Sequence, residues 1–114
     1  MDDCLFCKMA NGEIPVPKVY EDDNVFVISD INPQAPRHLL VIPRAHFPAI
    51  HTVPADNGTL YDALFSAVRT VVQKEGFAEK GYRLVINSGE SAGQSVDHIH
   101  VHILSGRRLQ WPPG

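Results

Sequence analysis

The chain has 114 residues, the size of one domain, and its 44% hydrophobic content is ordinary for a globular protein. Its formal net charge of −3 lacks the basic character that non-specific binding to nucleic acid requires, and it gives no reason to expect a membrane partner. The chain start is acidic and lacks the basic and apolar segments of a secretory signal, so we expect a cytoplasmic protein with reduced cysteines.

Periodicity and turn residues predict strands with one clear helix. In chain order, the predicted elements are a short helix at 5–10, strands at 18–20, 25–28 and 38–42, a helix at 59–74, and strands at 82–87 and 98–104. The long helix has an apolar stripe, Asp56 or Asn57 can cap its start, and Gly76 can end it. This order predicts an α+β fold in a single domain over residues 1–114, with the helix packed on one face of the sheet.

Three of the six histidines alternate with apolar residues in His98-Ile99-His100-Val101-His102-Ile103-Leu104. Alternation is the strand period, so we expect three imidazoles to project from one face of a strand. Burying imidazoles requires a partner for every ring nitrogen, so the row points to a functional rather than an incidental role. Such a row, with a remote histidine such as His38, His46 or His51, has the ligand types of a zinc site.

A second interpretation is a phosphate site, because a loop rich in small residues precedes the row. In Asn87-Ser88-Gly89-Glu90-Ser91-Ala92-Gly93-Gln94-Ser95, backbone amides can approach an oxyanion closely without a net positive charge. Ser95 adds a hydroxyl and Gln94 an amide. Imidazole can also attack phosphorus as a nucleophile, and a neighbouring imidazole can move the proton. Spacing alone leaves the metal and phosphate interpretations open.

The histidine segment resembles the signature of the histidine triad (HIT) superfamily. Three further segments resemble its Hint branch, the purine nucleoside phosphoramidases, and the similarity runs from about Cys4 to Gly114. These segments are Asp30-Ile31-Asn32-Pro33-Gln34-Ala35-Pro36 with His38-Leu39-Leu40-Val41-Ile42-Pro43, Gly93-Gln94-Ser95-Val96, and Trp111-Pro112-Pro113-Gly114. The resemblance implies a HIT-like fold: a five-stranded antiparallel sheet with one long and one short helix, continued across a homodimer.

The resemblance also implies catalytic roles for five residues. His100 corresponds to the nucleophile that attacks the α-phosphorus, and His102 to the histidine that contacts the phosphate oxygens. His98 and His38 match the histidines that orient the nucleophilic ring. Ser95 matches a hydroxyl near the leaving group.

The nucleotide site implied by the family has a polar and an apolar part. Asp30 matches the carboxylate that accepts hydrogen bonds from the ribose hydroxyls, a role suited to an acceptor-only group. Asn87, Gly93 and Gln94 match phosphate and ribose contacts. The residues that match the lining of the purine pocket are Leu5, Phe6, Met9, Ile28, Ile31 and Leu40. Trp111 is expected to reach the partner's pocket in the homodimer.

Cys4-Leu5-Phe6-Cys7 is compatible with half of a zinc site, a redox pair or coincidence. The redox interpretation lacks the βαβ context that such a pair normally occupies. Some bacterial HIT proteins combine such cysteines with histidines in a structural zinc site, and His46 and His98 are the matching residues here. Four Cys and His ligands form a closed structural site, so we expect no cofactor for catalysis and a possible structural zinc.

The resemblance implies a hydrolase that cleaves the P–N bond of purine nucleoside 5′-phosphoramidates, with an AMP- or GMP-type nucleotide as ligand. Two alternatives remain at this point. One is a dinucleoside polyphosphate hydrolase of a sister branch. The other is a nucleotide-binding or zinc-organised interaction module with little turnover.

Overall fold

The structure is a computed structural model that describes residues 3–114, so the first two residues of the acidic chain start lie outside it. Within this range the strands form one five-stranded antiparallel sheet in the order β1-β2-β3-β5-β4. The strands are β1 (Tyr20–Glu21), β2 (Val25–Ser29), β3 (Arg37–Pro43), β4 (Tyr82–Val85) and β5 (Val101–Ser105). The helices are α1 (Leu5–Ala10), α2 (Gly58–Lys74) and α3 (Phe77–Lys80). The predicted α+β class and antiparallel sheet are confirmed.

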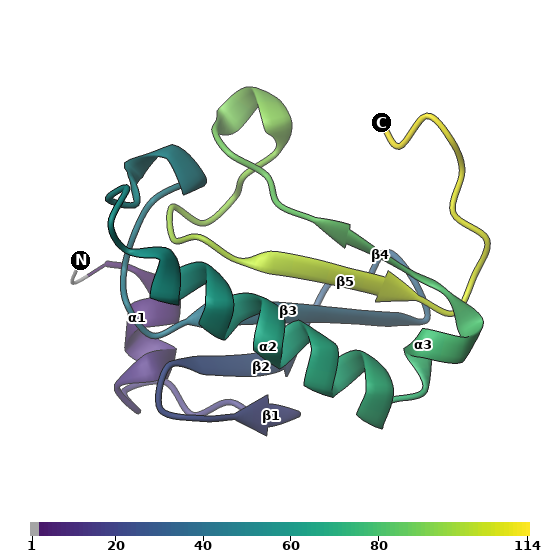
Figure 1. Cartoon of the computed structure of the whole chain (residues 1–114), viewed down its shortest axis with the longest axis horizontal. Coiled ribbons are helices and arrows are strands. Elements are labelled where there is room, and N and C mark those ends of the chain that lie inside the picture. The colour runs from purple at the N-terminus through teal and green to yellow at the C-terminus, as the bar shows by residue number, and fades with distance from the viewer. Residues whose placement is uncertain (1–2) are drawn as a thin grey trace.

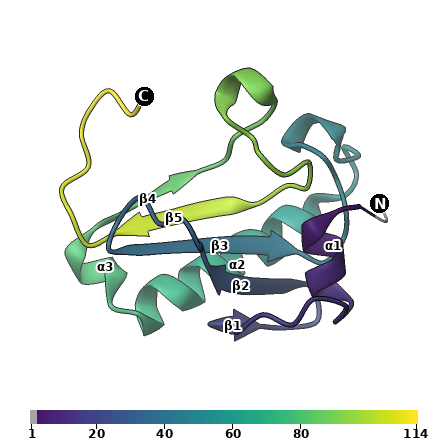
Figure 2. The same cartoon turned by 180° about the vertical axis from the view of Figure 1, so that it is seen from behind.

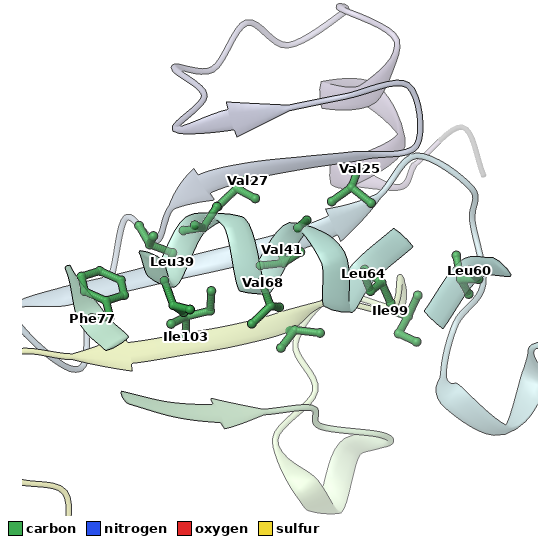
Figure 3. Packing of buried hydrophobic residues seen from close by; sticks show 14 of the residues in the cluster. Val25, Val27, Leu39, Val41, Leu60, Leu64, Val68, Phe77, Ile99 and Ile103 are labelled. Carbon is green, nitrogen blue, oxygen red and sulfur yellow. The ribbon is translucent and has the colours of Figure 1, made fainter. Parts of the chain in front are cut away.

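The two larger helices lie on opposite faces of the sheet: α2 crosses one face (Figure 1), and α1 lies against the other (Figure 2). Side chains alternate between these faces along β2 and β3, which are buried on both sides. On the α2 side, Val27, Val41 and Ile103 pack with the helix (Figure 3). On the α1 side, Phe26 and Leu40 pack with Phe6 in a second apolar cluster.

The buried stripe of α2 contains Leu60, Leu64, Ala67, Val68, Val71 and Val72. This is the stripe that the helical spacing predicts. The helix ends before Gly76, whose φ of +79° is the left-handed conformation that favours glycine. The short helix α3 follows immediately, and its Phe77 joins the same core.

The histidine segment departs from the predicted strand. β5 begins at Val101, so His98 and His100 precede the strand and His102 is the one member of the row within it. The ladder between β3 and β5 ends with the pair Val41 and Val101. The Ile99 N–H instead donates to the Phe47 carbonyl at 2.7 Å. The predicted strand at 98–104 is therefore wrong for residues 98–100, although His98 and His100 both contact Phe6 of α1.

Among the described residues, no helix has both the length and the apolar character needed to cross a bilayer.

The α2 stripe makes a direct prediction for stability. Leu64 is 1% exposed in the main core, so Leu64→Ala should lower the free energy of unfolding by about 2–5 kcal/mol in denaturant melts. Gln73→Ala, on the exposed side of the same helix, serves as the control and should change it by less than about 0.5 kcal/mol. Equal effects of the two substitutions would contradict this assignment of the core.

Candidate active site

A cavity of about 230 Å³ opens on the α1 side of the sheet. Its wall comes from α1, the end of β2 with the loop that follows it, β3, β5 and the segment that precedes β5. The lining residues are Leu5, Phe6, Met9, Ile28, Ser29, Asp30, Ile31, Leu40, Ser95, Val96, His100 and His102. All six residues predicted for the purine pocket therefore line one cavity, together with Asp30, Ser95 and two of the histidines. Ser29 and Val96 also line it and had no predicted role.

His100 is 5% exposed, and one hydrogen bond defines the state of its ring. Its Nδ1 lies 2.7 Å from the carbonyl oxygen of His98. A carbonyl can only accept, so Nδ1 carries the ring proton and donates it. Burial lowers the pKa of His100, which favours the neutral ring. The neutral ring therefore has an unprotonated Nε2, the form in which imidazole is a nucleophile.

His38 is oriented by the loop that joins β2 to β3. The backbone N–H of Gln34 donates to His38 Nδ1 at 3.0 Å, so the ring proton of His38 lies on Nε2. That Nε2 lies 2.9 Å from His102 Nδ1 and 3.4 Å from a carboxylate oxygen of Asp30. His38 Nε2 therefore donates to His102 Nδ1, which must be unprotonated to accept the bond.

The state of His102 follows from that contact. Burial, with the neighbouring His100 and His38, lowers the pKa of His102 to about 4. The ring is therefore neutral near pH 7. Since its Nδ1 accepts from His38, its proton lies on Nε2. His102 thus offers the cavity an N–H donor, the group that binds a phosphate oxygen.

Asp30, His38 and His102 bring one potential metal-ligand atom each within 4.8 Å of the others. The Gln34 bond argues against a metal there. A histidine ligand binds metal through an unprotonated nitrogen, whereas the His38 nitrogen that faces the other two residues carries the proton. Next to the nucleophile, His38 is therefore hydrogen-bonded to His102 and lies beside the Asp30 carboxylate.

His98 points to a different cluster, with Cys4, Cys7 and His46. The four donor atoms lie within 4.8 Å of one another. His98 Nδ1 lies 3.4 Å from Cys4 Sγ, 3.6 Å from Cys7 Sγ and 3.1 Å from His46 Nδ1, and Cys7 Sγ lies 3.3 Å from His46 Nδ1. A tetrahedron around zinc with these ligand types has edges of about 3.3–3.8 Å. The four donors therefore fit the chemistry and dimensions of a closed zinc site.

The remaining polar atoms of the cluster agree with this fit. His98 Nε2 donates to the Pro43 carbonyl at 2.7 Å, which leaves Nδ1 with a lone pair facing the cluster. Burial, and then the neighbouring His46 and His100, lower the pKa of His98 to about 4. Burial and Cys4 raise the pKa of the Cys7 thiol, so a bound cation would be needed to hold both sulfurs as thiolates.

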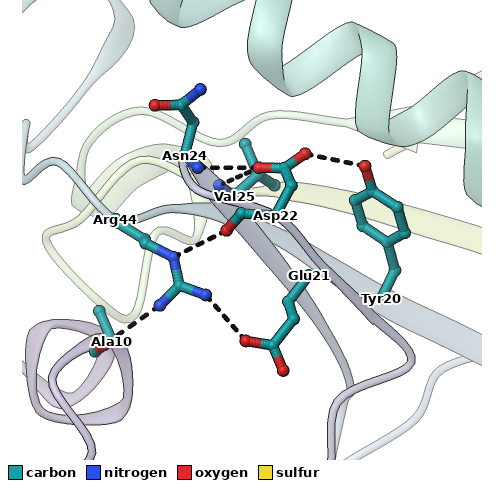
Figure 4. A network of polar contacts seen from close by, with 7 residues as sticks. All are labelled: Ala10, Tyr20, Glu21, Asp22, Asn24, Val25 and Arg44. Atoms are coloured by element: carbon teal, nitrogen blue, oxygen red, sulfur yellow. Dashed lines mark hydrogen bonds and ion pairs between the residues drawn. The ribbon is translucent and has the colours of Figure 1, made fainter.

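Arg44 joins two of the segments that carry the cluster through its hydrogen bonds (Figure 4). Its guanidinium donates to the Ala10 carbonyl at the end of α1 at 3.2 Å and to the Asp22 carbonyl at 3.1 Å. It also pairs with Glu21 at 3.1 Å. Because α1 carries Cys7 and the segment after Arg44 carries His46, these bonds hold the two halves of the cluster together.

Asn87, Gly93 and Gln94 do not line the cavity. The Gln94 amide accepts from the Gly89 N–H at 2.8 Å and donates to the carbonyls of Pro48 and Val96 at 2.6 and 3.1 Å. It therefore holds the loop in shape in this structure. Gly93 has a φ of +90° and closes a turn at Glu90–Ala92. Their contacts with a nucleotide stay predictions.

The comparisons with known proteins identify the family. The model of the HIT domain matches residues 11–109. The chain belongs to the HIT domain family. A relative with a similar sequence agrees with this assignment. An uncharacterized HIT-like protein of Synechococcus elongatus is 43% identical over 113 residues, covering 99% of this chain and 98% of that protein.

Solved HIT structures share the fold over nearly the whole chain. A HIT family hydrolase from Legionella pneumophila Philadelphia 1 has a TM-score of 0.94 at 48% identity, covering 98% of this chain and all of the other. A histidine triad nucleotide-binding protein from Candida albicans has a TM-score of 0.82 at 31% identity, covering 96% of this chain and 83% of the other. The predicted HIT family and fold are confirmed.

Proposed function

We propose that this HIT protein hydrolyses purine nucleoside 5′-phosphoramidates through a nucleotidyl-histidine intermediate on His100. The observation that carries the proposal is the 2.7 Å bond from His100 Nδ1 to the His98 carbonyl. That bond directs the lone pair of a buried, neutral imidazole to Nε2. It does so beside a cavity that is mostly apolar but contains one carboxylate and one further imidazole.

The reaction has two displacements at phosphorus. In the first, His100 Nε2 attacks the α-phosphorus, the bond from phosphorus to the leaving nitrogen breaks, and the amine departs with a proton. In the second, water attacks the same phosphorus, the bond to Nε2 breaks, and the products are a nucleoside monophosphate and free His100. The Nε2–H of His102 is assigned to the phosphate oxygens, where negative charge must be held in both steps.

The cavity suggests where the parts of the substrate bind. Leu5, Met9 and Leu40 are placed against the flat base, and Asp30 accepts from the ribose hydroxyls. Ser95 lies at the border with a second cavity of about 480 Å³, which it also lines. We place the leaving amine on that side, with the Ser95 hydroxyl as the group that delivers its proton. The water that attacks in the second step gives a proton back to Ser95. An apolar base pocket distinguishes shape rather than hydrogen-bonding edges, so adenosine and guanosine derivatives are both candidate substrates.

The relatives support the reaction class. The Legionella pneumophila structure is described as a hydrolase, and the Candida albicans protein as nucleotide-binding. Both descriptions are compatible with a histidine nucleophile that acts on a nucleotide.

His100→Ala should abolish turnover of an adenosine 5′-phosphoramidate, because the attacking nitrogen is lost. We expect kcat to fall by at least about a thousandfold while AMP binding persists. Intact mass spectrometry of the wild type during turnover should show an AMP adduct that peptide mapping places on His100. His51→Ala, which alters an exposed histidine outside the cavity, is the matched control and should retain wild-type activity.

Turnover that survives in His100→Ala would overturn the mechanism. Faster turnover of dinucleoside polyphosphates than of phosphoramidates would favour a sister activity at the same site. Nucleotide binding by the wild type without turnover of either substrate would indicate a binding module.

We further propose that Cys4, Cys7, His46 and His98 hold a structural zinc. The support is the convergence of four donors in a closed cluster and the bond from His98 Nε2 to Pro43. When bound, the ion would cross-link α1 to the segments after β3 and before β5. Two cysteines kept as thiolates suit a reducing compartment, so we place the protein in the cytoplasm.

His46→Ala should remove the zinc, because three ligands remain where four are needed. We expect about one zinc ion per chain in the wild type by elemental analysis, and a substantial loss in the variant. The melting temperature should fall with the ion, since metal binding contributes to folding free energy. His51→Ala should change neither quantity, and equal zinc content in both variants would contradict the assignment.

We also propose a homodimer whose sheet continues through β4. β4 is an edge strand with β5 as its neighbour, and its Tyr82 and Leu84 are exposed apolar residues. Leu84 pairs with Ile103, so both side chains lie on the α2 face of the sheet. Exposed apolar residues on an unpaired edge invite pairing with a second copy. Trp111, 82% exposed in the protomer, would then be available to the partner.

Leu84→Lys should weaken this dimer, because it puts a charge on the apolar edge. Sedimentation analysis is expected to show a dimer for the wild type and a shift toward monomer for the variant. Lys80→Ala, an exposed substitution in α3 just before the strand, is the control and should remain dimeric. A monomeric wild type would contradict the proposal.

A further inference from the structure

The loop of residues 30–36 carries two groups on which the site depends. One is the Asp30 carboxylate, and the other is the Gln34 N–H that binds His38 Nδ1. Of the six residues that follow Asp30 in this loop, all but Ala35 are exposed: Ile31, Asn32, Pro33, Gln34 and Pro36. A loop with so little burial gains little rigidity from packing, so its conformation depends on specific contacts.

The segment that follows β5 supplies such contacts. The Arg107 guanidinium donates to the Gln34 carbonyl from Nε at 3.1 Å and from Nη2 at 2.9 Å. Its Nη1 donates to the Arg108 carbonyl at 3.0 Å, which holds the guanidinium plane. The adjacent Gly106 packs against Pro36 so closely that a Cβ on the glycine would lie 2.9 Å from the Pro36 Cβ. Two successive residues therefore clamp the loop at two points.

Gln34 links this clamp to the histidines through its two backbone groups. Its carbonyl faces Arg107, and its N–H faces His38. Movement of the carbonyl would displace the N–H of the same residue. His38 would then lose the bond that keeps its proton on Nε2, and His102 would lose the donor that keeps its own proton on the side of the substrate.

We propose that Arg107 is a positioning residue for the reaction: by holding the Gln34 carbonyl, it maintains the tautomers of His38 and His102. The proposal rests on the proposed function for its effect on rate, but its structural part does not. The contact depends on the shape of the guanidinium, because two donors in one plane meet a single oxygen. The positive charge alone would not provide this geometry.

Kinetics of three variants separate shape from charge. Arg107→Ala should lower kcat by about 10- to 100-fold with little change in KM, because small misplacements of catalytic groups are costly and the base and ribose contacts remain. Arg107→Lys keeps the charge but lacks the two coplanar donors, so most of the decrease in kcat should persist. Arg108→Ala removes the neighbouring exposed arginine and should behave as the wild type. Full activity in Arg107→Lys, or an equal loss in Arg108→Ala, would overturn the proposal.

A double-mutant cycle tests whether Arg107 acts through His38. Adding Arg107→Ala to His38→Ala should cost little further activity, because the bond that it protects is already gone. Independent, multiplicative losses would overturn the proposed route.

Imidazole ¹⁵N NMR supplies a readout that requires no activity. His38 should be a single Nε2–H tautomer in the wild type and in Arg108→Ala, and a mixture in Arg107→Ala. An unchanged tautomer in Arg107→Ala overturns the positioning role even if the protein has no phosphoramidase activity. If the tautomer changes in Arg107→Ala and the wild type lacks turnover, the positioning role is retained and the proposed reaction is rejected.

Discussion

His98 is fully buried where α1, the end of β3 and the segment before β5 meet, and each of its polar groups has a different partner. Its backbone N–H donates to Val96, its Nε2 donates to Pro43, and its carbonyl accepts from His100. Its Nδ1 faces the two cysteines and His46. The same residue therefore belongs to the candidate metal cluster and determines the tautomer of the candidate nucleophile. The rest of the site depends on its placement.

A common feature of the site is that backbone groups determine the states of the imidazoles. The carbonyls of His98 and Pro43 determine which nitrogen is protonated in the rings of His100 and His98. The Gln34 N–H determines the tautomer of His38, and His38 in turn determines that of His102. Pro43 ends β3, His98 is fully buried and Gln34 is held by Arg107, so the protonated nitrogens are determined before any substrate binds. This is preorganisation of the kind that lowers the cost of charge development at phosphorus.

The two faces of the sheet have different roles. The α2 face carries the main hydrophobic core, in which Val41 and Ile103 pack with the long helix. The opposite face carries the cavity, bordered by α1, and the helix is held there by Arg44 and by the cysteine and histidine cluster. Because β3 is buried on both sides, His38 projects from a strand that packing holds in place.

Much of this arrangement could be predicted from local patterns. Helical spacing located α2 and its end at Gly76, and the residues that match the family motif line one cavity because their elements meet there. The histidine row was misjudged as one strand, since alternation cannot show where the ladder between β3 and β5 ends. No side-chain pattern could single out Gln34 or Pro43, since what each contributes to the histidines is a backbone group that every residue, or nearly every residue, possesses.

The sequence by itself determined the class of fold, the residues available for chemistry and the family to which the chain belongs. These depend on side-chain type and spacing, which the sequence states directly. Tertiary structure alone decided which ring nitrogen of each histidine carries the proton, and that Arg107 reaches Gln34 across 73 positions of the chain. Those are questions of distance and hydrogen-bond direction between segments far apart in sequence, and packing of the sheet answers them.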